Sequence, residues 1–258
     1  MKFLNSNHKT LSLFITAGYP TIETTVPLAV AMAEAGADLI ELGIPFSDPM
    51  ADGPTIQHSS ELALRNGVTL RKTLDLAREI RKRSSIPLVL MGYANPIYAY
   101  GLEQLLGEAH DSGVQGMIIP DLSLEESSEY RSIAQRKEMA TIFLAAPTTP
   151  PDRLARLDEA STGFLYCVSI TGVTGERQKI SNQTGDFLRM ARTKVKNNPL
   201  LVGFGISTPE DAREVASMSD GVIIGSALIK TIQSTSSSNI LEQVSKFVGS
   251  MRNALDAR

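Results

Sequence analysis

The sequence has little of several features that mark common classes of protein. Its 258 residues contain one cysteine, Cys167, which excludes an internal disulfide, and three histidines that are not spaced for a metal ion. No apolar run approaches the length that spans a bilayer, and the first residues lack the apolar core of a signal peptide. We therefore expect a cytoplasmic protein with no metal site.

Basic residues are not gathered into a patch, and the net charge is −3. The segment richest in them, residues 71–83, places Leu74, Ala77 and Ile80 at helical spacing, with the charges on the other faces. This pattern predicts a helix with a solvated face. A nucleic-acid partner is not expected.

Eight short apolar runs are present, and they alternate with helical patterns. The runs are continuous, as is typical of parallel strands buried on both faces. The predicted strands are Leu11–Ala17, Asp38–Gly43, Pro87–Gly92, Gly116–Ile119, Thr141–Ala145, Phe164–Ser169, Leu200–Phe204 and Gly221–Ile224. The predicted helices are Thr24–Ala35, Ile56–Arg65, Leu70–Lys82, Leu102–Asp111, Leu124–Lys137, Pro151–Glu159, Asp186–Lys196, Pro209–Met218 and Ile240–Ala257.

Repeated β/α units in a chain of this length predict a (β/α)₈ barrel, the TIM barrel, as a single domain over residues 1–258. We expect a short N-terminal helix around Phe3 and Leu4 to plug the barrel, and a C-terminal helix to close the chain. Gly36 and Gly113 fit the positions just after two helices, where a positive φ is needed. An open doubly wound sheet is the competing fold, but no Gly-x-Gly-x-x-Gly turn follows the first strand.

Two carboxylates, Glu41 and Asp52, stand in a segment that is otherwise nearly free of charge. Glu41 is near the end of the second predicted strand, and Asp52 is in the loop after it. Because barrel active sites lie at the C-terminal ends of the strands, the two can share acid–base chemistry in one cavity. The alternative is structural: a paired carboxylate for Glu41 and a helix N-cap for Asp52. No lysine lies near a strand end, so a Schiff-base aldolase has no evident nucleophile.

Three aromatic residues lie at the same mouth of the predicted barrel. Phe14, Tyr166 and Phe204 are on the first, sixth and seventh predicted strands and would line an apolar pocket. The alternative is that aromatic side chains fill the barrel core, which suits Phe143 and Phe164 better.

Glycines follow the last three predicted strands, in Thr171–Gly175, Gly203–Ser207 and Gly225–Ser226. The loops after strands seven and eight of this fold often bind phosphate with a helix N-terminus. Glycine lets backbone N–H groups approach an anion closely. The pattern therefore predicts a phosphate site.

These motifs resemble the tryptophan synthase alpha subunit family over nearly the whole chain. The matching segments are Phe14–Pro20, Glu41–Gln57, Tyr93–Pro96, Pro120–Leu122, Gly172–Gly175, Gly203–Ser207 and Gly225–Ser226. The resemblance implies a lyase of tryptophan biosynthesis. Its reaction is the retro-aldol cleavage of indole-3-glycerol phosphate to indole and glyceraldehyde 3-phosphate.

Site roles carry over by motif position. Glu41 would shuttle a proton between the glycerol hydroxyl and the indole carbon, and Asp52 would accept the indole N–H and stabilise the indolenine tautomer. The other implied contacts are Phe14, Tyr166 and Phe204 around the indole, backbone groups of Gly175, Gly205, Gly225 and Ser226 at the phosphate, and Thr174 in a closing loop.

The resemblance also implies a partner. The family works as an α₂β₂ assembly in which the beta subunit carries pyridoxal phosphate and receives indole, and no cofactor is expected on this chain. Two positions depart from the pattern: Ser123 stands where the family usually has proline, and Ile170 where some members have arginine. A catalytically weak regulatory subunit therefore remains an alternative. A different phosphate-binding barrel, such as a sugar-phosphate isomerase, would not need the Glu41–Gln57 block.

Overall fold

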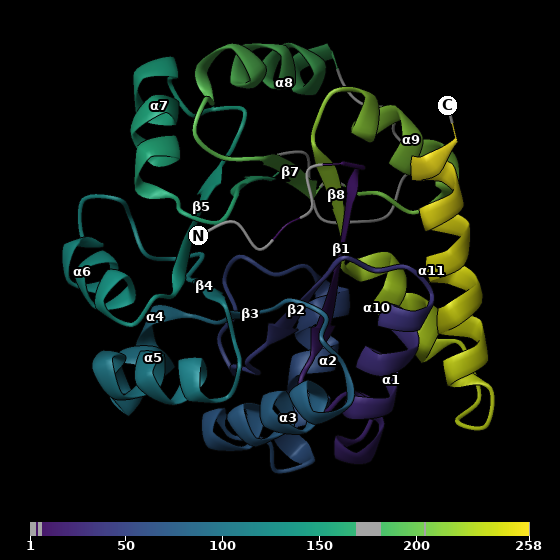
Figure 1. The fold of residues 1–258 in the computed structure, drawn as a ribbon. Helices are drawn as coiled ribbons and strands as arrows, with labels where there is room; N and C mark the ends of the chain where they lie inside the picture. Colours follow the sequence, from purple (N-terminus) through teal and green to yellow (C-terminus); the bar gives the residue numbers. More distant parts are fainter. Residues whose placement is uncertain (1–3, 5–6, 169–181, 204, 258) are drawn as a thin grey trace.

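The computed structural model describes residues 4, 7–168, 182–203 and 205–257. Within this part, eight parallel strands follow one another around a closed barrel, with the first strand hydrogen-bonded to the last (Figure 1). The strands are β1 (Thr10–Thr16), β2 (Leu39–Gly43), β3 (Leu88–Met91), β4 (Gly116–Ile118), β5 (Ala140–Ala145), β6 (Leu165–Val168), β7 (Leu200–Gly203) and β8 (Gly221–Ile224). The predicted fold class is confirmed, and each strand lies within two residues of its predicted bounds.

Helices surround the barrel. Within the described chain they are α1 (Ile22–Glu34), α2 (Pro54–Arg65), α3 (Leu70–Arg83), α4 (Ala94–Tyr100), α5 (Leu102–Asp111), α6 (Ser128–Arg136), α7 (Pro151–Ala160), α8 (Asn182–Lys194), α9 (Pro209–Ser217), α10 (Ser226–Gln233) and α11 (Ile240–Asp256). None of the helices described is long and apolar enough to cross a membrane.

Two helices were not predicted, and two predicted helix starts were wrong: α8 begins at Asn182 and not at Asp186, and the start of α6 also differs. The helices α4 and α10 are short and directly follow strands β3 and β8. Pro96 makes the start of α4 resemble a turn, but it occupies the first helical turn, where its missing N–H does no harm. Helix α6 begins at Ser128 and not at Leu124, because residues 124–127 form turns.

The apolar side chains form two layers. The larger cluster lies between the strands and the helices, and a smaller one fills the barrel interior. The interior residues are Leu39, Val89, Ile118, Ala140, Ile142, Phe164, Leu201 and Ile223. Leu4 packs against this interior cluster, as expected of a plug. The rest of the predicted N-terminal helix, including Phe3, lies outside the described residues.

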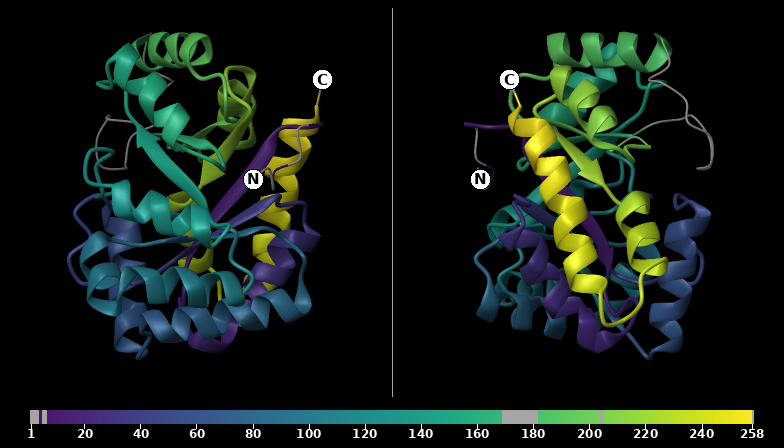
Figure 2. Two further views of the ribbon diagram at one scale, coloured as in Figure 1. Left: turned by 60° about the vertical axis from the view of Figure 1, so that its left-hand side comes forward. Right: turned by 90° about the vertical axis from the view of Figure 1, so that its right-hand side faces the viewer.

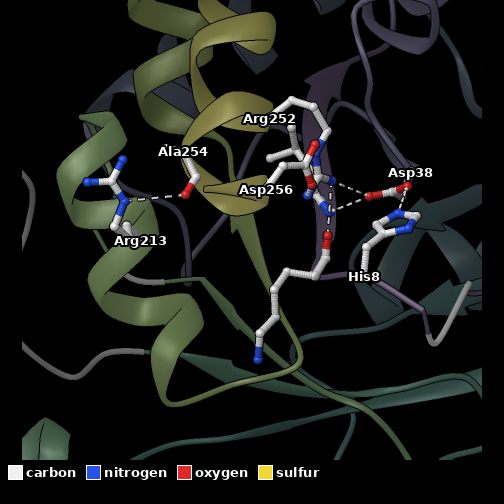
Figure 3. A network of polar contacts seen from close by, with 8 residues as sticks. His8, Asp38, Arg213, Arg252, Ala254 and Asp256 are labelled. Carbon is white, nitrogen blue, oxygen red and sulfur yellow. Dashed lines mark hydrogen bonds and ion pairs between the residues drawn. The ribbon is translucent and has the colours of Figure 1, made fainter. Parts of the chain in front are cut away.

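The C-terminal helix α11 packs against α1 and α9 on one side of the barrel (Figure 2). Arg252 of α11 donates hydrogen bonds to the Lys9 carbonyl and to Asp38 Oδ2, each at 3.0 Å, and it also pairs with Asp256 (Figure 3). His8 contacts the other Asp38 oxygen at 2.7 Å. These residues precede β1 and β2, so the network fastens α11 to the N-terminal end of the barrel, opposite the predicted site.

Glycine conformations agree with two sequence predictions. Gly36 and Gly113 follow the ends of α1 and α5 with φ of +104° and +78°. A Cβ atom at Gly36 would also lie 2.8 Å from Arg252 Cγ. Glycine at position 36 therefore allows the positive φ at the end of α1 and leaves room for Arg252 of α11.

Candidate active site

Glu41 is the central residue of β2 and lies opposite Phe14 of β1 and Val89 of β3. Its side chain shares the barrel interior with Leu39, because alternate residues of a strand point to the same face. The side chain is completely buried. Glu41 is therefore held in the interior by the sheet, in surroundings that are mostly apolar.

The two carboxylate oxygens of Glu41 have different surroundings. The Ser12 hydroxyl donates a hydrogen bond to Oε1 at 2.7 Å. Within the described part of the chain, Oε2 has no hydrogen-bond partner. Burial raises the pKa of Glu41 to about 7, and the Ser12 hydrogen bond opposes that rise. At neutral pH, Glu41 can therefore both give and take a proton.

Asp52 approaches the same end of the barrel from the loop between β2 and α2. Gly53 is the N-cap of α2, so the N-cap alternative for Asp52 is wrong. The Tyr93 hydroxyl hydrogen-bonds to Asp52 and accepts a hydrogen bond from the Ala51 N–H at 3.1 Å. Burial raises the pKa of Asp52 to about 6, and the bond from Tyr93 opposes that rise.

Tyr166 connects the two carboxylates electrostatically. Burial raises the pKa of the Tyr166 hydroxyl, and the charges on Glu41 and Asp52 raise it further. Both carboxylates therefore act on one hydroxyl. Glu41 and Asp52 therefore both lie within electrostatic reach of the Tyr166 hydroxyl.

Small residues at strand ends make room for the two described aromatic rings. A Cβ atom at Gly43 would lie 2.5 Å from Phe14 Cζ, and one at Gly203 would lie 2.5 Å from Tyr166 Cε2. Phe143 and Phe164 are buried in the core, as expected. Glycine at these two positions is thus explained by the rings that cover it.

A small cavity lies beside Asp52 and Tyr93. Phe14, Gly43 and Met91 also line it, and its volume of about 20 Å³ has room for about one water molecule. Asp52 therefore borders a space with room for a small polar group.

The N-terminus of α10 has the features expected of an anion site. Gly225 is its N-cap and Ser226 its first residue. The first N–H groups of a helix have no acceptor within the helix, so they are available to an anion. Apart from its chain neighbours, no atom of the described residues lies within 4 Å of a Cβ built on Gly205, which has φ of +22°. Within the described part of the chain, Gly205 and Gly225 therefore leave room beside the backbone.

Some predicted site residues cannot be placed. Thr174, Gly175 and Phe204 lie outside the described residues, as does Ile170. Ser123 is described: its hydroxyl donates to Glu126 Oε2 at 2.7 Å and accepts from the Glu126 N–H at 3.3 Å. Ser123 thus shapes the turn before α6.

Two site residues had no role in the sequence predictions. Ser12 is a polar residue in an apolar strand, and that was the available signal for it. Tyr93 belongs to a family motif, but only the folded chain joins it to Asp52. No cluster of three or more His, Cys, Asp or Glu side chains that could hold a metal occurs among the described residues. Cys167 is buried, as predicted.

Comparisons with known proteins identify the family of this chain. The family model described as "Tryptophan synthase alpha chain" matches residues 1–256. A tryptophan synthase alpha chain of Pelobacter propionicus is 45% identical over 249 residues, which are 96% of this chain and 93% of that relative.

Solved structures of tryptophan synthase alpha subunits have a similar fold. The tryptophan synthase alpha subunit of Legionella pneumophila is 39% identical, with a TM-score of 0.88 over 96% of this chain and 93% of that one. A mutant alpha subunit from Pyrococcus furiosus is 40% identical, with a TM-score of 0.88 over 95% of this chain and 99% of that one. The chain belongs to the tryptophan synthase alpha chain family.

Proposed function

We propose that this chain cleaves indole-3-glycerol phosphate to indole and glyceraldehyde 3-phosphate, with Glu41 as the proton shuttle and Asp52 as the partner of the indole N–H. Family membership supports the reaction. The observation that carries the assignment of residues is the fully buried Glu41, with one oxygen unpartnered among the described residues, in a site shared with Asp52.

The reaction balances with these two groups. Protonated Glu41 gives its proton to the indole carbon that bears the glycerol chain, and the ring nitrogen becomes positively charged. Asp52, as the carboxylate, stabilises that charge by accepting a hydrogen bond from the ring N–H. The Glu41 carboxylate then removes the proton of the adjacent hydroxyl. As the hydroxyl becomes a carbonyl, the carbon–carbon bond breaks and its electron pair returns to the ring.

The pKa values suit this division of work. A group with a pKa of about 7, as for Glu41, is present in both protonation states at neutral pH. Asp52, with a pKa of about 6, is mostly ionised there. Two carboxyl groups with separated pKa values are a common basis for acid and base roles in one site.

The same residues are proposed to bind the two ends of the substrate. Phe14 and Tyr166 offer apolar rings for the indole, together with Phe204. Backbone N–H groups of Gly205, Gly225 and Ser226, with Gly175, are proposed to hold the phosphate, and Thr174 to help close the site. Binding energy from the distant phosphate can then position the reacting carbon atoms.

The family name implies a beta-chain partner. We propose that this chain joins a beta subunit in an α₂β₂ assembly in the cytoplasm. That subunit would carry the pyridoxal phosphate and take up the indole, and this chain would need no cofactor of its own.

A direct assay tests the proposal. The purified chain is incubated with indole-3-glycerol phosphate, with and without a beta subunit, and indole and glyceraldehyde 3-phosphate are measured. Equal amounts of both products are expected, with a faster rate in the complex. Activation of the beta reaction without either product would instead identify the regulatory alternative.

A further inference from the structure

We propose that Ser12 is a positioning residue for Glu41: its hydroxyl holds Oε1, so that Oε2 is the oxygen that carries the proton to and from the substrate. This inference rests on the role of Glu41 in the proposed function.

The sheet register brings the two side chains together. Ser12 pairs with Leu39 across β1 and β2, and Glu41 pairs with Phe14, two residues further along each strand. Ser12 and Glu41 therefore occupy adjacent interior levels of neighbouring strands. Their contact of 2.7 Å is that of a strong hydroxyl–carboxylate bond.

Burial makes this contact important. Both side chains have 0% exposure, so water cannot replace the hydroxyl if it is removed. The serine hydroxyl can donate only one hydrogen bond, and Glu41 accepts that bond at Oε1. The contact fixes the orientation of a carboxylate that is otherwise surrounded mostly by apolar groups.

The asymmetry of the oxygens identifies the reacting one. Because Oε1 is already accepting a hydrogen bond, protonation at Oε2 preserves that bond. Oε2 is also the oxygen without a partner among the described residues, so it is free to meet a substrate. The proton in transit is therefore expected on Oε2.

The other groups around Glu41 do not compensate for Ser12. Its neighbours in register, Phe14 and Val89, are apolar. Tyr166 of β6 and Asp52 of the loop after β2 are the titratable groups coupled to the site. No ion pair to Glu41 occurs in the described chain. Removing the Ser12 hydroxyl should thus raise the pKa of Glu41, since that hydrogen bond favours its ionised form.

The test is the pH profile of indole formation by Ser12→Ala. Glu41 acts first as an acid, so its ionisation forms the basic limb of the profile. We expect that limb to move upward by about one pH unit, and kcat at the optimum to fall about tenfold with KM within about twofold of wild type. Ser12→Thr, which keeps the hydroxyl, should restore both. Thr10→Val changes another buried residue of β1 and should leave the profile unchanged.

An infrared titration of the Glu41 carboxyl provides a readout besides activity. Difference spectra against Glu41→Gln isolate its band, and Ser12→Ala should shift the midpoint upward. An unshifted midpoint and profile in a folded Ser12→Ala protein would overturn the inference. If Ser12→Ala does not fold, an unshifted midpoint in a folded Ser12→Gly protein overturns it equally.

Glu41→Gln separates this inference from the proposed function. Normal turnover in Glu41→Gln would remove the proton shuttle, and the inference with it. An inactive Glu41→Gln beside an unaffected Ser12→Ala would leave the proposed function intact and reject only the positioning role.

Discussion

A Cβ atom at Gly203 would lie 2.5 Å from Cε2 of Tyr166 and 2.7 Å from its hydroxyl oxygen. At Gly225 the nearest atom to such a Cβ is Phe14 Cβ, at 3.4 Å, which is an ordinary contact. The two glycines end β7 and follow β8, yet they meet different constraints. Gly203 makes room for a ring, whereas Gly225 has space for a methyl group beside the N-terminus of α10.

This difference predicts that substitution by alanine affects substrate binding at Gly225 and stability at Gly203. Gly225→Ala should raise KM for indole-3-glycerol phosphate by about tenfold through crowding of the anion, and should change the free energy of unfolding by under about 1 kcal/mol. Gly203→Ala should destabilise the protein by about 1–3 kcal/mol because the Tyr166 ring must move. Steady-state kinetics and urea unfolding measure both effects. An unchanged affinity of Gly225→Ala for inorganic phosphate would argue against an anion site at α10.

Tyr93→Phe should weaken the support of Asp52. The loss of one hydrogen bond to the carboxylate raises the pKa of Asp52, so the acidic limb of the pH profile should move upward. Turnover at pH 7 should fall by about tenfold, as is typical when a charged group loses a buried hydrogen bond. Tyr98→Phe, on the exposed side of α4, is the matched control. Identical pH profiles for the two variants would contradict a role of Tyr93 at the site.

Arg252→Met should destabilise the fold without slowing the reaction. Arg252 is 13% exposed and holds Asp38, which is 19% exposed, together with the Lys9 carbonyl. The loss should reduce the free energy of unfolding by about 1–3 kcal/mol. Arg65→Met is the control, because its pair with Glu61 is 72% and 60% exposed and worth little. Equal urea midpoints for the two variants would show that the network does not fasten α11.

The strands were predictable because each is a short, continuous apolar run that alternates with a helical pattern along the chain. Helices α4 and α10 were missed since seven or eight residues after a strand show too little periodicity. Glu41 and Asp52 could be found as charges in apolar surroundings. Their partners could not, because Ser12 reaches Glu41 only through the register of β1 and β2.

The late glycines illustrate a second limit. From the sequence, all three clusters predict an anion site. Gly203 instead lies against Tyr166, and only Gly205 and Gly225 remain open to a ligand among the described members. A side chain that packs against a glycine from another strand leaves no trace in the local sequence.

Glu41→Gln should change how stability depends on pH. In the folded chain Glu41 has a pKa of about 7 against an ordinary value of 4.5, so the folded state binds more protons between these pH values. The free energy of unfolding therefore falls as pH rises through this window, by on the order of 3 kcal/mol. In Glu41→Gln this fall should be absent.

Urea unfolding at pH 5 and pH 8 checks this expectation. The difference in stability between Glu41→Gln and wild type should move in favour of the variant at pH 8. Glu61→Gln, at an exposed position, is the control and should follow wild type at both pH values. Parallel pH dependence of Glu41→Gln and wild type would mean that Glu41 is not held protonated by the fold.

The central claim is that Glu41 moves the proton in the cleavage reaction, and the rate of indole formation by Glu41→Gln tests it most directly. At saturating indole-3-glycerol phosphate and pH 7, the variant should be slower than wild type by about 10²–10⁴-fold, the usual loss for a general acid–base group. Its circular dichroism and cooperative unfolding should match those of wild type. Turnover within a few fold of wild type in a folded Glu41→Gln protein would contradict the account.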